Sequence, residues 1–444
     1  MSAMLDDAKA RSSDSIHSIL RVAFPACLWL IALTNVARLG PLLAARGTQT
    51  DFSIYMLSGH AFNSNENHYR ADFDTEAREI GVNNLAITNA TDPPTFILLF
   101  APLSRLPPQK AFWIWTAING VALIAAMLII VGPGSGIPGW IAWSFAAVAM
   151  IYPPVIASFY NGQNKILLML LLALMMRSMR SGNDAMSGLA LALAGLTRIF
   201  PFLMIAYLVI ERRWGALRYT FLCLIVCIPI TIALFGLSNS LSFGRDGVNL
   251  LTAQRYLSQP QNIALDAYIS RWLWSINGPG LSPSYEALRR IAIVIGDLLI
   301  FFVTLRATIS IRRCGDDNFR FLSLWIVTSI LLSPTVWVFY LVLLLIPFAQ
   351  IAAACSAGEV TRRTLWSAGI SVLLIFLAIS PHSEIAFSTN PWLRMTIGEC
   401  RFYSLIAAYL SVYFFAIDQT EAVHVPLRIV PALAWQRLSG AEAN

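Results

Sequence analysis

The chain has 444 residues, of which 57% are hydrophobic and only 12% are charged, and its formal net charge is +7. Soluble domains usually carry about 25% charged residues, so this composition excludes a string of soluble domains. The basic excess is thin, scattered and without interleaved aromatic residues, which excludes a nucleic-acid partner and is typical of topology signals beside a lipid bilayer. We predict an all-α polytopic integral membrane protein, because only helices satisfy their own backbone hydrogen bonds in lipid.

The length suits a bundle of roughly ten to thirteen transmembrane helices of about 20 residues each. Residues 1–18 are polar, and we expect them to form a disordered cytoplasmic tail. The membrane domain is expected over residues 19–417 and a second cytoplasmic tail over residues 418–444. The six cysteines and five histidines are dispersed without metal-ligand spacing, so we predict no metal site and no cofactor.

The first apolar run, residues 22–39, is longer than the core of a signal peptide and is predicted to be an uncleaved span. A polar loop over residues 44–93 follows and holds most of the exposed acids. Thr95–Leu106 is apolar but short and lies between two proline pairs, so it either crosses at a tilt or re-enters. The later runs expected to span are residues 111–131, 140–157, 216–235, 291–309, 366–379 and 402–417.

Short apolar segments occur in pairs. Residues 185–196 and 202–210 flank Arg198, and arginine pairs bracket them on both sides. If those arginines are cytoplasmic, the segments form a hairpin with Arg198 at its outer apex; a single span would bury Arg198 in mid-helix at high cost. The same logic applies to residues 321–332 and 338–353. It places the loops 44–93 and 236–285 outside the cytoplasm.

Asp51 begins the first loop and is the strongest catalytic candidate. The residues after it, including Phe52 and Tyr55, form a weakly amphipathic stretch that we expect to lie at the membrane interface. A carboxylate there faces water and still reaches a lipid headgroup, which suits a general base acting on a hydroxyl. The alternative is an ordinary loop acid or helix cap.

Other polar residues are candidates for substrate contacts. Arg198 is placed to bind a lipid phosphate through a charge-assisted contact, or to snorkel to the interface. Arg255 in the second loop is a further phosphate candidate, or a solvated charge. Asn161 and Gln163 lie at a helix junction, where amides either bind sugar hydroxyls or cap helices.

A set of motifs follows in order along the chain: Asp51-Phe52-x-x-Tyr55 with Gly59 and Tyr69, Asp92-Pro93-Pro94-Thr95-Phe96, Asn161-Gly162-Gln163-Asn164, Gly195-Leu196-Thr197-Arg198, and Leu332-Ser333-Pro334 before Trp337. Over about residues 45–355 this set resembles glycosyltransferase family 87. That family comprises polyprenyl-phosphate-mannose-dependent α-mannosyltransferases of the GT-C superfamily.

The resemblance implies a GT-C-type bundle with short helical hairpins and two larger extracytoplasmic loops, in the cell (inner) membrane. It implies transfer of a hexose, mannose in the family, from a polyprenyl-phosphate sugar to a glycan or glycolipid acceptor, with inversion. Asp51 matches the family's base. The residues that we expect to bind substrate are Tyr55, Asp92, Asn161, Gln163, Arg198, Arg255 and Trp337.

The chain departs from the family at three places. Arg198 stands where a lysine is usual, Asp92 where an aromatic residue is usual, and Val338-Phe339-Tyr340 where glutamate and histidine often occur. These changes bear on the sugar and the acceptor more than on the fold. The alternative function is a transporter or flippase of lipid-linked substrates, which should show intramembrane ionisable residues and repeated halves. A catalytically inactive scaffolding relative is a third possibility.

Overall fold

The computed structural model describes residues 2–46, 48, 50–82, 91–251, 257–277, 283–312, 319–377 and 390–418, which are predominantly helical and contain no strand. In chain order the helices are α1 (Ser2–Arg46), α2 (Asp51–Asn63), α3 (Phe73–Ile80), α4 (Pro94–Ile97), α5 (Phe100–Leu103), α6 (Pro108–Val131), α7 (Gly139–Ile151), α8 (Pro153–Tyr160), α9 (Lys165–Arg180), α10 (Asp184–Thr197), η2 (Phe200–Leu203), α11 (Met204–Ile210), α12 (Trp214–Phe235), α13 (Leu237–Ser242), η3 (Phe243–Gly247), α14 (Val248–Leu251), α16 (Leu265–Asn277), α17 (Pro283–Arg312), α18 (Phe319–Leu331), η4 (Val338–Leu344), α19 (Leu345–Ser356), α20 (Arg362–Leu377), α22 (Pro391–Thr396) and α23 (Cys400–Ile417). The predicted all-α polytopic class is confirmed.

Six stretches of helix among the described residues are long and apolar enough to cross a membrane: Ile19–Ala45, Pro108–Val131, Trp214–Phe235, Tyr285–Ser310, Val338–Ser356 and Cys400–Ile417. Helices α7 and α8 form a further span that bends by 46° at the proline pair after Tyr152, because a proline disfavours helical geometry in the residue before it. Four shorter apolar helices accompany them. By length and composition the described residues therefore contain six spans, or seven with the bent pair, fewer than the expected ten to thirteen transmembrane helices.

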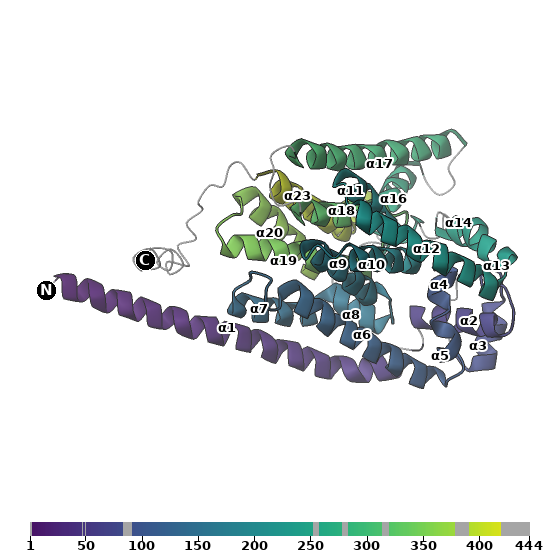
Figure 1. The fold of residues 1–444 in the computed structure, drawn as a ribbon, viewed down its shortest axis with the longest axis horizontal. Helices are drawn as coiled ribbons and strands as arrows, with labels where there is room; N and C mark the ends of the chain where they lie inside the picture. The colour runs from purple at the N-terminus through teal and green to yellow at the C-terminus, as the bar shows by residue number, and fades with distance from the viewer. Residues whose placement is uncertain are drawn as a thin grey trace.

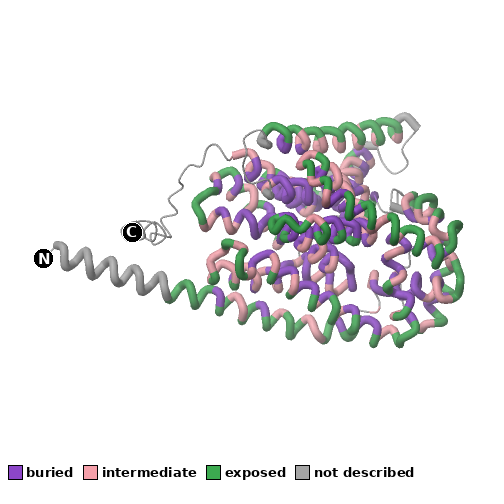
Figure 2. Tube along the Cα trace, viewed as in Figure 1, coloured by how far each residue is buried: buried purple, intermediate pink, exposed green. Residues whose placement is uncertain are grey.

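The bundle has a buried centre and lipid-exposed flanks. Helix α1 runs along one side and α17 along the opposite side, and Figure 1 shows the remaining helices between them. Only 11% of the α1 window and 17% of the α17 window are buried, against 72% of the η4–α19 window. Figure 2 shows the same contrast between the exposed flanks and the buried centre. The exposed apolar side chains of α1 and α17 therefore face lipid.

Helix α1 extends much further than the first apolar run. It begins at Ser2 and continues to Arg46, so the expectation that residues 1–18 are disordered is wrong. No glycine or proline interrupts residues 2–24, and such sequences keep helical propensity even when polar. In Figure 1 the N-terminal part of α1 projects beyond the rest of the bundle.

The predicted hairpin around Arg198 is confirmed. Gly215 lies against Asp184, and Thr220 Oγ1 donates a 3.2 Å hydrogen bond to the carbonyl of Gly188. Later positions on α10 contact later positions on α12, so these two helices run parallel. The η2–α11 segment, which joins them in the chain, therefore runs back in the opposite direction. Arg198 lies at the turn, at the opposite end of the bundle from the start of α12.

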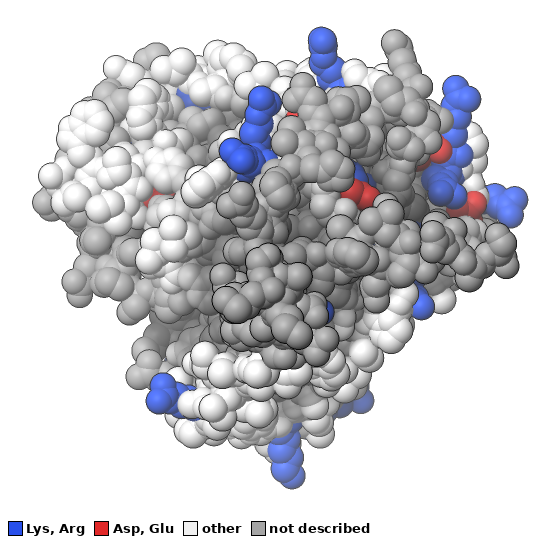
Figure 3. Space-filling view, turned by 90° about the vertical axis from the view of Figure 1, so that its left-hand side faces the viewer, with Lys and Arg blue, Asp and Glu red and all other residues white. Residues whose placement is uncertain are grey.

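The arginine clusters gather at one end. Lys165 at the start of α9 lies near Tyr340, and Gln350 further along donates a hydrogen bond to the sulfur of Met176 near the end of α9. The η4–α19 segment therefore runs beside α9 in the same direction. The arginines in the last turn of α9, before α12 and at the start of α20 therefore share one end of the bundle. Figure 3 looks onto that end and shows basic side chains around its rim, with fewer acidic ones. Helices α2–α5 lie at the other end (Figure 1).

The short segment Thr95–Leu106 stays at this second end. The rings of Phe96 and Tyr55 lie 5.0 Å apart, and Asn63, at the last turn of α2, donates hydrogen bonds to Ala101 and Ser104. The segment therefore follows α2 along its whole length, as α4 and α5. Of the two possibilities left open by the sequence, the structure favours re-entry over crossing.

The first loop is folded, and α2 is its central element. Phe52 and Leu57 are fully buried and Tyr55 is only 3% exposed, so the expectation that this stretch lies on the membrane interface is wrong. Aromatic rings from α4, α5 and α6 surround it. The same packing places Asp51, at the first turn of α2, inside the protein.

The second loop is also largely helical, with α13, η3, α14 and α16. Arg271 on α16 is 5% exposed and pairs with Glu399 through two hydrogen bonds of 2.5 and 2.6 Å. It also donates to the carbonyls of Leu257, Gln259 and Asn262. Arg271 therefore clamps the segment just before α16 to Glu399, the residue before α23.

Candidate functional site

The Asp51 carboxylate is held by an amide from a distant helix junction. Gln163 Nε2 donates a 2.6 Å hydrogen bond to Asp51 Oδ2. The Tyr55 hydroxyl, one turn further along α2, donates to Gln163 Oε1 at 3.0 Å. With Oδ2 held in this way, Oδ1 is the oxygen available to take a proton.

The turn that carries Gln163 requires a glycine. Gly162 has φ +60°, and a Cβ at this position would lie 2.6 Å from Cβ of Phe52. Both the conformation and the close approach exclude other residues. Trp115 Nε1 on α6 donates a 2.7 Å hydrogen bond to the Gly162 carbonyl. The turn between α8 and α9 is thus fixed against the start of α2.

Asp92 and Arg198 form a buried ion pair. Arg198 Nη2 lies 2.8 Å from Asp92 Oδ1, and the two side chains are 11% and 4% exposed. Tyr69 donates to the Asp92 carbonyl at 2.8 Å, and Thr95 donates to the Leu196 carbonyl at 2.6 Å. These bonds hold the segment before α4 against the hairpin apex. Arg198 Nε is buried and makes no hydrogen bond among the described residues.

A second cation, Lys165, lies in the same region. It is fully buried at the first residue of α9, and its Nζ contacts Gln163 Oε1 at 3.3 Å as well as the side chain of Asn164. The Tyr340 ring centroid lies 4.6 Å from Lys165 Nζ and 5.9 Å from Arg198 Cζ. One aromatic ring thus lies close to two positive charges, a favourable arrangement for each.

The electrostatic environment of Asp51 is mixed. Burial raises the pKa of Asp51 above its ordinary value, while the hydrogen bond from Gln163 and the charge of Lys165 oppose that rise. The charges of Asp92 and Arg198 also act on it, with opposite signs. A carboxylate with a raised pKa is a stronger base than an exposed one, which is the property that general base catalysis needs.

The predicted site residues fall into three groups: those near Asp51, two others within the described residues, and one outside them. Asp51, Tyr55 and Gln163 are joined by hydrogen bonds, and Asp92 with Arg198 lies close enough to influence Asp51. Asn161 ends α8 and donates to the Ala157 carbonyl at 2.8 Å, and Trp337 is half-buried before η4. Arg255 lies outside the described residues.

Sequence reasoning missed Lys165 and Tyr340 as members of this cluster. Lys165 is a lone charge between a polar junction and a long apolar run, and that position was a signal, because an ionisable residue at the edge of a span is often functional. Tyr340 was noticed only as a departure from the family pattern. The structure gives it a contact with both cations.

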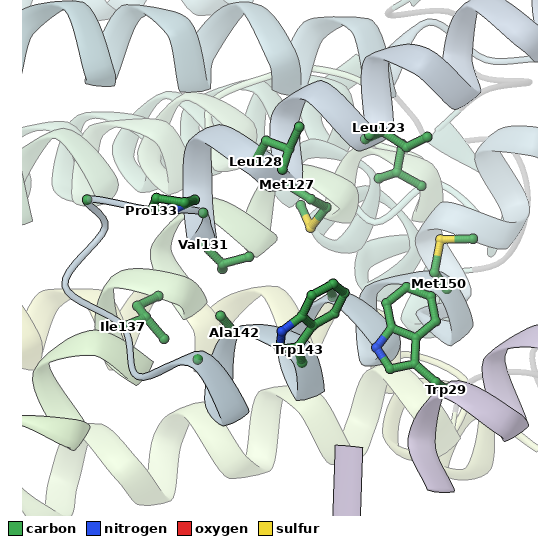
Figure 4. Close-up of a pocket in the computed structure, with 15 residues that line it drawn as sticks. Trp29, Leu123, Met127, Leu128, Val131, Pro133, Ile137, Ala142, Trp143 and Met150 are labelled. Atoms are coloured by element: carbon green, nitrogen blue, oxygen red, sulfur yellow. The ribbon is translucent and has the colours of Figure 1, made fainter. Parts of the chain in front are cut away.

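A separate apolar cavity of about 540 Å³ lies between α1, α6 and α7. Trp29 and Trp143 meet edge to face across it, with ring centroids 6.1 Å apart, and Figure 4 shows Met127 and Met150 beside them. The described residues that line it carry no charge, so it offers no base. No group of three or more potential metal ligands occurs among the described residues.

Comparisons with known proteins bear on the family. The model of glycosyltransferase family 87 matches residues 90–334. No curated protein matches the chain. Among solved structures, the crystal structure of ArnT from Cupriavidus metallidurans in the apo state is similar over 92% of this chain and 77% of that chain, with 13% identity and a TM-score of 0.37.

The family match includes Asp92, Gln163, Lys165 and Arg198, whereas Asp51, Tyr55 and Tyr340 lie outside it. The resemblance seen in the sequence reached further at both ends, from about residue 45 to about residue 355. The matched region still makes up more than half of the chain, and it contains the described helices from α4 to α18. The chain therefore belongs to glycosyltransferase family 87 and is a membrane glycosyltransferase.

Proposed function

We propose that this glycosyltransferase takes a hexose, with mannose as the first sugar to test, from a polyprenyl-phosphate donor. The acceptor is a hydroxyl of a glycan or glycolipid on the extracytoplasmic side of the cell membrane. Asp51 is the general base. The observation that carries the proposal is the Asp51 carboxylate, partly buried and held through one oxygen by Gln163, in a cluster with two cations.

The reaction is a single displacement. Asp51 Oδ1 takes the proton of the acceptor hydroxyl as its oxygen attacks the anomeric carbon. The new glycosidic bond forms while the bond from that carbon to the phosphate oxygen breaks, and the electron pair leaves with the polyprenyl phosphate. Attack opposite the leaving group inverts the configuration at the anomeric carbon.

Free hydrogen-bond donors support a phosphate in the cluster. Arg198 Nε and Asn164 Nδ2 are both buried, and neither makes a hydrogen bond among the described residues. Buried donors are rarely left unpaired, and each such case calls for an explanation. A phosphate oxygen from the donor supplies acceptors for such groups, and the nearby positive charge stabilises the leaving group as it departs. The remaining predicted contacts, from Tyr55, Asp92, Asn161, Arg255 and Trp337, are proposed to involve the sugar or the acceptor.

The test is transfer by the purified full chain in lipid vesicles. Polyprenyl-phosphate mannose, glucose and galactose are supplied separately with a crude envelope glycolipid acceptor, and products are identified by mass spectrometry. We expect one hexose to appear in a new glycosidic bond with inverted configuration. A nucleotide sugar serves as the donor control, and transfer from it alone would contradict the polyprenyl-phosphate assignment.

The alternative function, a transporter or flippase of lipid-linked substrates, predicts a different result in the same vesicles. A flippase moves the intact lipid-linked sugar across the bilayer and forms no new glycosidic bond. Transbilayer movement that depends on the protein, with no covalent product from any donor, would favour that reading.

A further inference from the structure

Lys165 lies at a position where the helix dipole disfavours a positive charge. The N-terminus of a helix carries a partial positive charge, which disfavours a cation at the first residue. Lys165 lies there at the start of α9 and has no exposed surface. Among the described residues no carboxylate lies within ion-pair distance of its ammonium group. Residues that break local rules in this way often belong to functional sites.

The neighbours of Lys165 connect it to Asp51. Gln163 Oε1 accepts hydrogen bonds from Lys165 Nζ at 3.3 Å and from the Tyr55 hydroxyl at 3.0 Å. An ammonium group can only donate. The amide oxygen of Gln163 must therefore face Lys165, and its NH₂ group must face Asp51, where it donates at 2.6 Å. Lys165 thereby determines the orientation of the group that holds the carboxylate.

The positive charge of Lys165 also favours the ionised form of Asp51. Of the charged groups that influence Asp51, Lys165 has the largest effect, ahead of Asp92 and Arg198. Arg198 is already paired with Asp92, so their effects on Asp51 offset each other. The Tyr55 and Tyr340 hydroxyls also face this region and influence the same charges. The charge of Lys165 favours ionised Asp51. Burial and the charge of Arg198 lower the pKa of Lys165 itself, and the charges of Asp92 and Asp51 oppose that lowering.

We propose that Lys165 is a positioning residue that, through Gln163, orients the Asp51 carboxylate and keeps it ionised for catalysis. The inference rests on the proposed function, in which Asp51 is the base. It assigns the two cations of the cluster different tasks. Arg198 serves the donor phosphate, and Lys165 serves the base.

The first experiment compares the pH dependence of kcat in wild type and Lys165→Met, using the full chain in lipid with saturating donor. Methionine has a similar length and no charge. We expect the acidic limb of the profile to move to higher pH, with a loss of about tenfold per pKa unit of displacement at pH values below the acidic limb of the wild type. The rate should recover toward wild type at alkaline pH, and KM for the donor should stay unchanged.

Two controls accompany it. Lys110→Met removes an exposed lysine from the first turn of α6 and should leave the profile unchanged. Lys165→Gln is a second neutral variant that keeps hydrogen-bonding capacity, should methionine prevent folding. A loss that is equal at every pH, or one that lies in KM for the donor, would overturn the proposal.

The second experiment does not depend on turnover. In an infrared pH titration, the band of the protonated Asp51 carboxyl is identified by its absence from Asp51→Asn. We expect this band to persist to higher pH in Lys165→Met than in wild type; an unchanged titration would refute the role of Lys165. If instead the band moves while Asp51→Asn retains full transfer activity, then Lys165 acts on Asp51 as proposed and it is the assignment of the base that fails.

Discussion

Gln163 donates a 2.6 Å hydrogen bond to Asp51 although the two residues are 112 positions apart in the chain. Replacing Asp51 by Asn keeps the size and polarity of the side chain and removes the proton acceptor. We expect transfer to fall by about 10²–10⁴-fold, the usual contribution of a general base, with little loss of folded protein. Initial transfer rates and thermal unfolding in detergent measure the two effects. Asp74→Asn, an exposed acid of the same loop, is the control and should stay near wild type.

The pH profile of the wild-type enzyme reports the environment of Asp51. Burial raises the pKa of this carboxyl, and the ionised form is the active base. The rate should therefore be full above the raised pKa and fall as the pH drops through it, at a higher pH than an exposed aspartate would give. Measuring kcat against pH at saturating donor tests this. An acidic limb at the ordinary pKa of a free carboxyl would contradict a buried base.

Arg198→Ala should weaken donor use more than Arg198→Lys, which keeps the charge. The alanine variant also leaves the Asp92 carboxylate buried without its cation, and breaking a buried pair in this way costs about 3–5 kcal/mol. The double variant Asp92→Asn with Arg198→Ala separates the two effects. We expect it to regain stability but still to show a raised KM for the donor, whereas full recovery of donor use would remove Arg198 from the phosphate site.

The Arg271–Glu399 pair should dominate the stability of the second loop. Both side chains are almost fully buried, so Arg271→Ala or Glu399→Ala alone should lower stability by about 3–5 kcal/mol. Replacing both with apolar residues of similar size should cost much less. Unfolding in mixed micelles, followed by tryptophan fluorescence, gives the comparison. A loss in the double variant equal to the sum of the two single losses would show that the charges are not coupled.

The sidedness of the bundle is testable by cysteine labelling. Ser64 after α2 and Ser181 after α9 are both exposed, and they lie at opposite ends of the bundle. We expect Ser64→Cys to react with an impermeant maleimide in intact cells, and Ser181→Cys to react only after permeabilisation. The parent protein supplies the background from its own cysteines. The reverse pattern would place the candidate site on the cytoplasmic side.

Much of the architecture was predictable because its signals are local. Apolar runs predicted five of the six long spans, whereas the sixth, Val338–Ser356, had been expected to be one arm of a hairpin. Arginine clusters around short segments predicted the hairpin that turns near Arg198. The helix α3 was also readable, since Asp72 caps its start and Gly81 ends it in a left-handed conformation. It was assigned to a loop because its composition is polar.

The assembly of the site was only partly predictable. Asp51, Tyr55 and Gln163 were each singled out, but the contact between α2 and the α8–α9 junction depends on Gly162, Phe52 and Trp115 packing across the fold. One sequence does not encode such a contact in any local pattern. The contacts of Lys165 with Gln163 and Tyr340 could not be predicted for the same reason, although its position as a lone charge beside an apolar run was a signal.

The two residues of the Arg271–Glu399 clamp are synthesised at different times, because Arg271 comes first in the chain. The ribosome makes Arg271 128 positions before its carboxylate partner, so during translation the guanidinium waits while α17, α18, α19 and α20 are inserted. The segment that Arg271 fixes also binds Val336 through Asn262, next to the aromatic residues of η4. The segment before α16 therefore reaches its final bonding only after the turn before α23 has been synthesised.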